Sequence, residues 1–243
     1  MIRQTIFGLL LASALSAQTT GEAILRRVDA NLTADTKIIT SKMIIHGRRG
    51  TRTVEARSYI DGTTRSFTEY LAPARDAGTK MLKLGDQLWT YSPQSDRIIK
   101  ISGHMLRQSV MGSDLSYEDM MEDPRLAPLY SAEILGQEEY DGRPCWVLKL
   151  VADKIETAYP QRKVWVDNER YIFLKEERLA KSGKLLKTTT VSDVKLLDGR
   201  WTPMHVWFKD ELQTGEGTEF IIESIQVNAR IPEHYFTKAV LRQ

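Results

Sequence analysis

Residues 81–101, MLKLGDQLWTYSPQSDRIIKI, decide the fold of this chain. Apolar and polar residues alternate along them, which is the pattern of half-buried antiparallel strands. Gly85-Asp86 and the run 93–95 interrupt the alternation as turns do. Trp89 and Tyr91 stand two positions apart on the strand between these turns, so they share one of its faces. The stretch therefore predicts a β-meander.

The next segment, 104–121, reads HMLRQSVMGSDLSYEDMM and loses the period of two. Four of the chain's eight methionines fall in it, and methionine adapts to irregular apolar partners. Two interpretations stay open: a broken helical lid over an apolar surface, or a helix that closes the end of an ordinary barrel. If the segment is a lid, its apolar residues are candidates for contact with a ligand: Met105, Leu106, Val110, Met111 and Leu115.

Strands dominate the rest of the chain. Short alternating runs recur with turn signals such as Asp61-Gly62, Asp141-Gly142 and Asp198-Gly199 between them, which predicts antiparallel hairpins. About a dozen strands at this spacing indicate an all-β barrel or sandwich. The expected strands are 37–46, 52–60, 64–71, 79–84, 87–91, 97–101, 131–140, 145–152, 163–166, 171–179, 185–196, 201–209 and 218–227.

The first residues predict an export signal. Arg3 precedes an apolar run, 6–15, that is too short to span a bilayer, and small residues follow it. We expect cleavage after Ala17, with Ala14 as the alternative, so that 1–17 is a signal peptide and 18–243 is a single domain. The expected location is the periplasm. No cysteine follows the apolar run, so no lipid anchor is expected there.

Charge argues against two classes of partner. Cleavage removes 17 of the 243 residues and one charge, Arg3, so 226 residues remain and the net charge falls from +2 to +1. Nucleic-acid binding needs a clustered basic excess, and stable attraction to anionic membranes needs a polybasic segment. We therefore expect no nucleic acid as a partner, and no more than a transient membrane contact.

A helix is expected at the start of the mature chain. Thr19 and Glu22 fit a capping box, and the helix should end near Ala34. Its apolar residues lie on one face, which should pack on the sheet: Ile24, Leu25, Val28 and Leu32.

Several strands are apolar on both faces. Trp146 and Leu148 share one face and Cys145 and Val147 the other, while Val206 and Phe208 oppose Trp207. A two-layer sandwich needs only one apolar face per sheet, so this pattern suggests a sheet covered by helices on one side and facing a second apolar space. The alternative is an ordinary core with scattered surface aromatics. The strand residues expected to line a cavity are Trp89, Tyr91, Trp146, Leu148, Val206 and Phe208.

No catalytic or metal-binding pattern is found in the sequence. The four histidines are scattered, and there is no Gly-x-Ser-x-Gly motif. Ser116 with Asp119 is typical of a helix cap. Gly112, Ser113 and Asp114 are either a turn before that helix or a polar hinge of the lid that meets a cargo headgroup. Cys145 lies in a strand and is expected to be buried and inert.

The order of elements resembles the LolA/LolB-like superfamily, and more closely the bacterial outer membrane lipoprotein-sorting proteins. The resemblance covers nearly the whole mature chain and implies a mainly β fold, a strongly curved, incomplete antiparallel barrel with a helical lid over its concave face. It also implies an arginine inside the barrel that holds the lid closed, for which Arg52, Arg57 and Arg65 are candidates. The residues that carry it are 80–83 (KMLK), Gly85-Asp86, 89–93 (WTYSP), 97–101 (RIIKI), 111–116 (MGSDLS), Asp119, 140–142 (YDG) and 165–167 (WVD).

The resulting hypothesis is a periplasmic carrier, with no cofactor, that shields a lipoprotein acyl chain or another hydrophobic lipid on its way to the outer membrane. An inner-membrane transporter and an outer-membrane acceptor are the implied partners. One alternative is an envelope sensing module that binds a membrane protein. The other alternative is an enzyme that acts on a lipid, which the absence of catalytic motifs disfavours.

Overall fold

The structure is a computed structural model that describes residues 19–153 and 156–243. The expected signal peptide, 1–17, lies outside the described residues. Within those two ranges, no helix is both long and apolar enough to cross a membrane.

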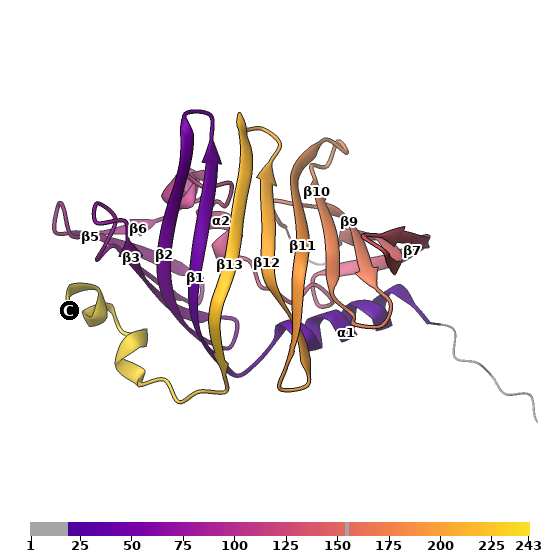
Figure 1. The fold of residues 1–243 in the computed structure, drawn as a ribbon, viewed down its shortest axis with the longest axis horizontal. Coiled ribbons are helices and arrows are strands. Elements are labelled where there is room, and N and C mark those ends of the chain that lie inside the picture. Colours follow the sequence, from indigo (N-terminus) through magenta and orange to yellow (C-terminus); the bar gives the residue numbers. More distant parts are fainter. Residues whose placement is uncertain (1–18, 154–155) are drawn as a thin grey trace, which may run out of the picture.

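The strands of the described residues belong to one antiparallel sheet of 13 strands that curves without closing into a barrel (Figure 1). The predicted mainly β fold with an incomplete barrel is confirmed, and each expected strand is present with ends within three residues of those predicted. The strands are β1 Thr36–Gly47, β2 Gly50–Asp61, β3 Arg65–Ala72, β4 Lys80–Leu84, β5 Gln87–Ser92, β6 Arg97–Ile101, β7 Tyr130–Tyr140, β8 Arg143–Ala152, β9 Gln161–Asp167, β10 Phe173–Leu179, β11 Leu185–Leu197, β12 Arg200–Asp210 and β13 Gly215–Val227.

The chain enters and leaves the sheet at its middle. Hairpins run outward from β1 to β6 at one edge, the chain crosses to β7 at the other edge, and hairpins return to β13 beside β1. The central pair therefore joins distant parts of the sequence, from Lys37↔Val227 to His46↔Gly217. The crossing segment carries the 3-10 turns η1 Gly103–Arg107 and η2 Val110–Gly112 and the short helix α2 Tyr117–Met121. Residues 103–123 are called the lid below.

Turn residues with positive φ explain the tightness of the hairpins. Asp141 and Gly142 have φ of 51° and 69°, and Asp198 and Gly199 have φ of 47° and 75°. Two successive residues with positive φ make the turn whose twist matches that of the flanking strands, and Asp-Gly adopts it readily. The predicted strand at 171–179 starts only at Phe173, because Tyr171 has a φ of 54° and lies in the preceding turn.

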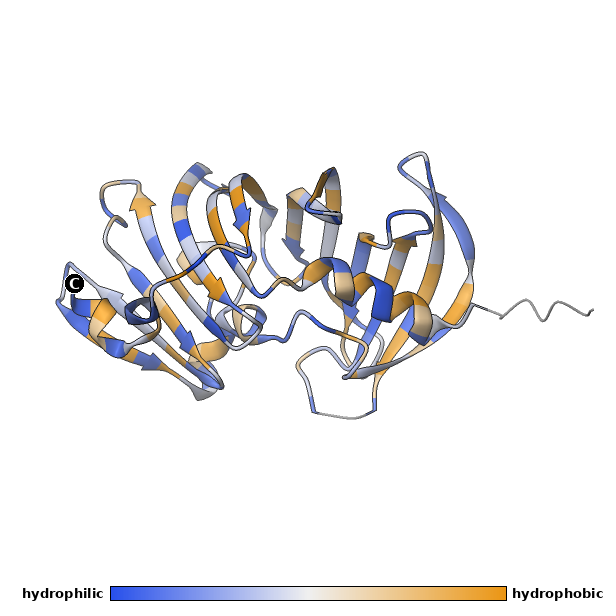
Figure 2. Ribbon diagram, turned by 90° about the horizontal axis from the view of Figure 1, so that it is seen from below, coloured by the Kyte–Doolittle hydropathy of each residue, from blue (hydrophilic) through white to orange (hydrophobic). Residues whose placement is uncertain are grey.

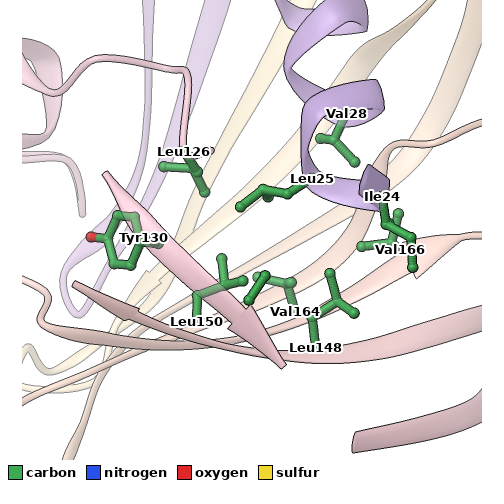
Figure 3. Close-up of a cluster of buried hydrophobic side chains, with 10 residues drawn as sticks. Ile24, Leu25, Val28, Leu126, Tyr130, Leu148, Leu150, Val164 and Val166 are labelled. Atoms are coloured by element: carbon green, nitrogen blue, oxygen red, sulfur yellow. The ribbon is translucent and has the colours of Figure 1, made fainter. Parts of the chain in front are cut away.

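The helix α1 Gly21–Leu32 covers the concave face at the β7–β9 end of the sheet (Figure 3). Ile24, Leu25 and Val28 are fully buried, each contributing about 1.5–3 kcal/mol of apolar burial. The helix begins one residue later than predicted: Thr20, not Thr19, is its N-cap and accepts a 3.2 Å hydrogen bond from the Ala23 amide. The partners of these three residues in the cluster are Leu126, Tyr130, Ala132, Leu148, Leu150, Val164 and Val166.

The other half of the sheet is covered on both sides. On its concave face the lid packs Met105 and Leu106 against Met81, Leu88 and Ile101. On its outer face lie the C-terminal 3-10 turns, η3 Glu233–Phe236 and η4 Lys238–Arg242, which lie beside this half of the sheet in Figure 2. Hydrophobic and hydrophilic residues alternate along the strands in the same view, as expected for a sheet with two different faces.

Candidate functional site

Three adjoining cavities form a groove along the concave face, and all three are lined by Phe220 of β13. The first, of about 140 Å³, lies between the lid and β1–β3. The second, of about 400 Å³, also borders the lid and extends to β9 and β10. The third, of about 260 Å³, extends to the end of α1. Leu115 and Met120 line the first and second cavities, and Leu32 and Phe208 line the second and third, so neighbouring cavities share walls.

Alternate residues of the central strands supply an apolar lining. The first cavity is lined by buried side chains of three strands, Met43 of β1, Val54 of β2 and Tyr70 of β3. Val110 of the lid packs against them, and its side chain is only 2 % exposed. Two of the polar residues of the lining pair with each other, since the Ser58 and Thr68 hydroxyls lie 2.8 Å apart. This end of the groove therefore offers a surface suited to hydrocarbon rather than to a charged ligand.

Arg52 joins the lid to the β1–β3 half. Its guanidinium donates to the Met111 carbonyl of the lid and pairs with Asp76 at 3.0 Å. Met111 has a φ of 52°, so its carbonyl is presented by an uncommon backbone conformation. Of the three candidate arginines, Arg52 is the one placed against the lid: Arg57 is exposed, and Arg65 pairs with Asp61 and Glu233.

The Gly112-Ser113-Asp114 motif is a turn tied to the sheet, with Ser113 and Asp114 buried and Gly112 exposed. The Asp114 carboxylate accepts hydrogen bonds from the Thr218 hydroxyl at 2.7 Å and from the Asp210 amide at 2.9 Å. The Ser113 hydroxyl donates to the Val110 carbonyl at 2.7 Å. This geometry is that of the predicted turn, while a hinge or headgroup role for the motif stays a prediction.

Acidic residues of the lid pair with cations of three strands. Asp119 of α2 contacts Arg178 of β10 at 3.0 Å and accepts a hydrogen bond from Lys187 of β11. Glu122 contacts Arg162 of β9 at 2.7 Å and Arg178 at 3.2 Å. Glu176 completes the group, 2.6 Å from Arg162 and 3.1 Å from Arg178. These residues, Asp119, Glu122, Arg162, Glu176, Arg178 and Lys187, are called the ionic cluster.

Burial and charge act in opposite directions on the lid carboxylates. Burial alone raises the pKa of Asp119, but Arg178 and Lys187 outweigh it and hold that pKa at about 2. For Glu122, burial prevails over the same kind of attraction and raises its pKa. Asp119 also serves as N3 of the capping box of α2, in which its carboxylate accepts a 2.7 Å hydrogen bond from the Ser116 amide. The predicted cap is confirmed, and the sequence did not reveal the ionic partners of Asp119.

The other predicted site residues divide into three groups. Val206 and Phe208 line the groove, and their contact with a ligand stays a prediction. Trp146 and Leu148 face the concave side but lie under α1, where Leu148 is fully buried in the core and Trp146 packs against it. Met105 and Leu106 belong to the lid and pack on the sheet, outside the three cavities that share Phe220.

Trp89 and Tyr91 lie on the opposite face of the sheet from the lid, and the prediction that they face the lid cavity is wrong. Trp89 packs with Phe67, Val240 and Leu241 beneath the C-terminal turns. Its neighbour Leu88 is the residue that meets the lid. Alternation correctly put Trp89 and Tyr91 on one face, but it does not reveal which face of a sheet is concave.

The sheet also brings together histidines that are far apart in the sequence. Glu219 of β13 lies between His46 of β1 and His205 of β12. Its carboxylate accepts hydrogen bonds from the His46 ring at 2.7 Å and the His205 ring at 2.8 Å, and these bonds lower the pKa of Glu219. Among the described residues, no group of three or more His, Cys, Asp and Glu side chains is arranged to hold a metal ion. Cys145 is buried as predicted, and burial raises its pKa to about 11.

Comparisons with known proteins agree on the fold. A family model described as an uncharacterized protein matches residues 62–243. No curated protein matches the chain. A putative outer membrane lipoprotein-sorting protein domain from Vibrio parahaemolyticus superposes with a TM-score of 0.80 at 26% identity, covering 92% of this chain and 98% of that one.

Two further crystal structures share this architecture. A DUF1329 family protein from Desulfovibrio piger has a TM-score of 0.82 at 24% identity, covering 91% of this chain and 97% of that one. A LolA superfamily protein from Nitrosomonas europaea has a TM-score of 0.76 at 21% identity, covering 92% of this chain and 100% of that one. At these identities the two structures support the fold.

Proposed function

Because the chain belongs to the LolA-like superfamily, in the group of outer membrane lipoprotein-sorting proteins, we propose that it is a periplasmic carrier of lipoprotein acyl chains or of another hydrophobic lipid. The groove takes the chain, and the lid shields it from water. An inner-membrane transporter loads the carrier and an outer-membrane acceptor unloads it during transient membrane contact. In this function residues 1–17 are removed as a signal peptide, and residues 18–243 act as one domain. The carrier performs no catalytic step and needs no cofactor.

The observation that supports this proposal is the groove around Phe220, whose first and third cavities are mainly apolar and whose second cavity is apolar on one side. Its second and third cavities, about 400 and 260 Å³, fall near the range of small-molecule sites. Each methylene transferred into such a site gains about 0.8 kcal/mol before ordering costs. A long acyl chain therefore binds there by burial alone, with Val110, Leu115 and Met120 of the lid covering it.

The first experiment is native mass spectrometry of the protein purified from a periplasmic fraction, followed by lipid extraction. We expect a bound species of defined mass that carries at least one acyl chain. A protein that stays free of lipid after isolation and after incubation with envelope lipids contradicts the carrier function and favours a protein-interaction module.

A pair of variants localises the binding. Phe220→Asp puts a charge in the lining that the three cavities share, and we expect it to weaken the binding of a fluorescent fatty acid at least about tenfold, because a carboxylate facing the groove opposes an apolar, negatively charged ligand. Leu196→Asp is the matched control, since Leu196 is 55 % exposed and lies outside the groove. Equal binding by Phe220→Asp, Leu196→Asp and the unaltered protein would place the ligand elsewhere.

A further inference from the structure

The second cavity of the groove has an apolar side and a charged side. Leu32, Phe173, Phe208 and Phe220 line the first, and residues of the ionic cluster line the second. An amphiphile with an acyl chain and an anionic group presents the same two kinds of surface. The cavity is therefore more specific in its chemistry than a purely apolar site.

The cations of the charged side are built into the sheet. Arg162 is 3 % exposed and is oriented by a 2.9 Å hydrogen bond from its Nε to the Tyr130 hydroxyl and a 2.6 Å pair with Glu176. Arg178 is 14 % exposed and is oriented by its Nε bond to Glu176 at 3.1 Å. Their remaining ion pairs, to Asp119 and Glu122, go to the lid.

Charge balance in the ionic cluster depends on where the lid lies. With the lid in place, three cations face three carboxylates, and two of these carboxylates, Asp119 and Glu122, belong to the lid. If the lid moves away, Arg162, Arg178 and Lys187 face Glu176 alone. The three cations would then lack two of their three carboxylate partners, so the open form favours another anion at this place.

We propose that the ionic cluster is an anion subsite, which Asp119 and Glu122 of the lid occupy in the closed form and which the phosphate or carboxylate of a bound amphiphile occupies in the open form. The inference rests on the carrier function proposed above and names the class of cargo: an acyl lipid or lipopeptide with an anionic group near its chain. Guanidinium groups suit this role, because their donors match the paired oxygens of phosphate and carboxylate. The low pKa of Asp119 keeps the competing lid carboxylate ionised at neutral pH.

The test compares two lipids with identical acyl chains, anionic phosphatidylglycerol and neutral diacylglycerol, each titrated into the full chain from a neutral detergent. The measured quantity is the ratio of the two affinities. We expect the unaltered protein to prefer phosphatidylglycerol at least about tenfold, which corresponds to one or two charge-assisted hydrogen bonds. Equal binding of both lipids overturns the anion subsite and leaves the carrier function intact, whereas binding of neither lipid overturns both.

Variants with opposite expected effects make the test specific. Arg178→Gln removes a cation and should lower the ratio toward one, whereas Glu122→Gln removes a competing carboxylate and should raise it. Lys195→Gln changes an exposed lysine of β11 and should leave the ratio unchanged. If Arg178→Gln does not fold, Glu122→Gln alone decides: a gain for both lipids equally means that the variant only loosens the lid, which overturns the subsite.

Inorganic phosphate separates the two sources of the anion. We expect phosphate without a lipid to bind at least about tenfold more weakly than phosphatidylglycerol, because it lacks the chain that the apolar side of the cavity holds. Phosphate binding as tight as that of the lipid would show a site for the free anion and overturn the amphiphile.

Discussion

On the β1–β6 half of the sheet the lid packs Val110 among Met43, Val54 and Tyr70, whereas on the β9–β11 half it sets Asp119 and Glu122 against cations. Apolar packing is non-directional and depends on the volume and apolar area of the side chains rather than on their charge. Ion pairs in a buried site are lost almost entirely when one partner leaves. The two contacts are therefore expected to respond to different conditions: charge, pH and anions act on the ionic half, and volume and apolarity act on the other.

The largest effect is expected when the ionic half loses one cation. Arg162→Ala leaves Glu122 and Glu176 buried without their main partner, and the free energy of unfolding should fall by about 3–5 kcal/mol. Urea denaturation measures it. Lys195→Ala, at an exposed position of the same sheet, should change the free energy by less than about 0.5 kcal/mol. A loss below about 1 kcal/mol in Arg162→Ala would mean that the ionic half does not hold the lid.

A smaller effect is expected when Asp119 is protonated. Its pKa in the folded protein, about 2, lies below its unfolded value of 3.8, so its ionisation stabilises the fold at pH values above about 4. About 2 kcal/mol of this stabilisation should be lost as the pH falls from about 4 to about 2. Urea midpoints over this range measure it, with Asp119→Asn expected to show a shallower decline. Asp86→Asn, at an exposed turn, should follow the unaltered protein; identical curves for all three would exclude Asp119 as the titrating group.

The smallest effect is expected in the apolar half. Val110→Ala removes two buried methyl groups and should lower the free energy of unfolding by about 1.5 kcal/mol, independent of pH between 4 and 7. The same substitution at Val151, which is 36 % exposed, should cost less than about 0.5 kcal/mol. A pH-dependent loss in Val110→Ala would show that the two halves are coupled rather than separate.

The sequence predicted the fold well because its signals are local. Asp141-Gly142 and Asp198-Gly199 set turns through their own backbone preferences, and alternation marks each strand without reference to distant residues. The site was predicted less well, because strand alternation gives two faces and not their curvature. Trp89 and Tyr91 were therefore assigned to the wrong side, while Phe220 was missed.

The ionic cluster shows the same limit, with one local signal that was available. Arg162, Val164 and Val166 share a strand face, so an arginine stands on an otherwise buried row of β9. A charged residue in such a row must find a partner. Its partner Glu122 lies 40 residues earlier in the chain, and only the crossing of the lid over the sheet brings the two together.

The central pairing of β1 with β13 also determines the order in which the sheet assembles. The hairpins from β1 to β6 and from β7 to β13 each join neighbours in sequence, so they form early. The seam between Lys37 and Val227 must close a loop of nearly the whole chain, which makes it the slow step. Until β13 arrives, one side of β1 is an unpaired edge twelve residues long, open to strands of other molecules. We therefore expect the risk of aggregation of a newly made chain to depend on how long that edge stays unpaired.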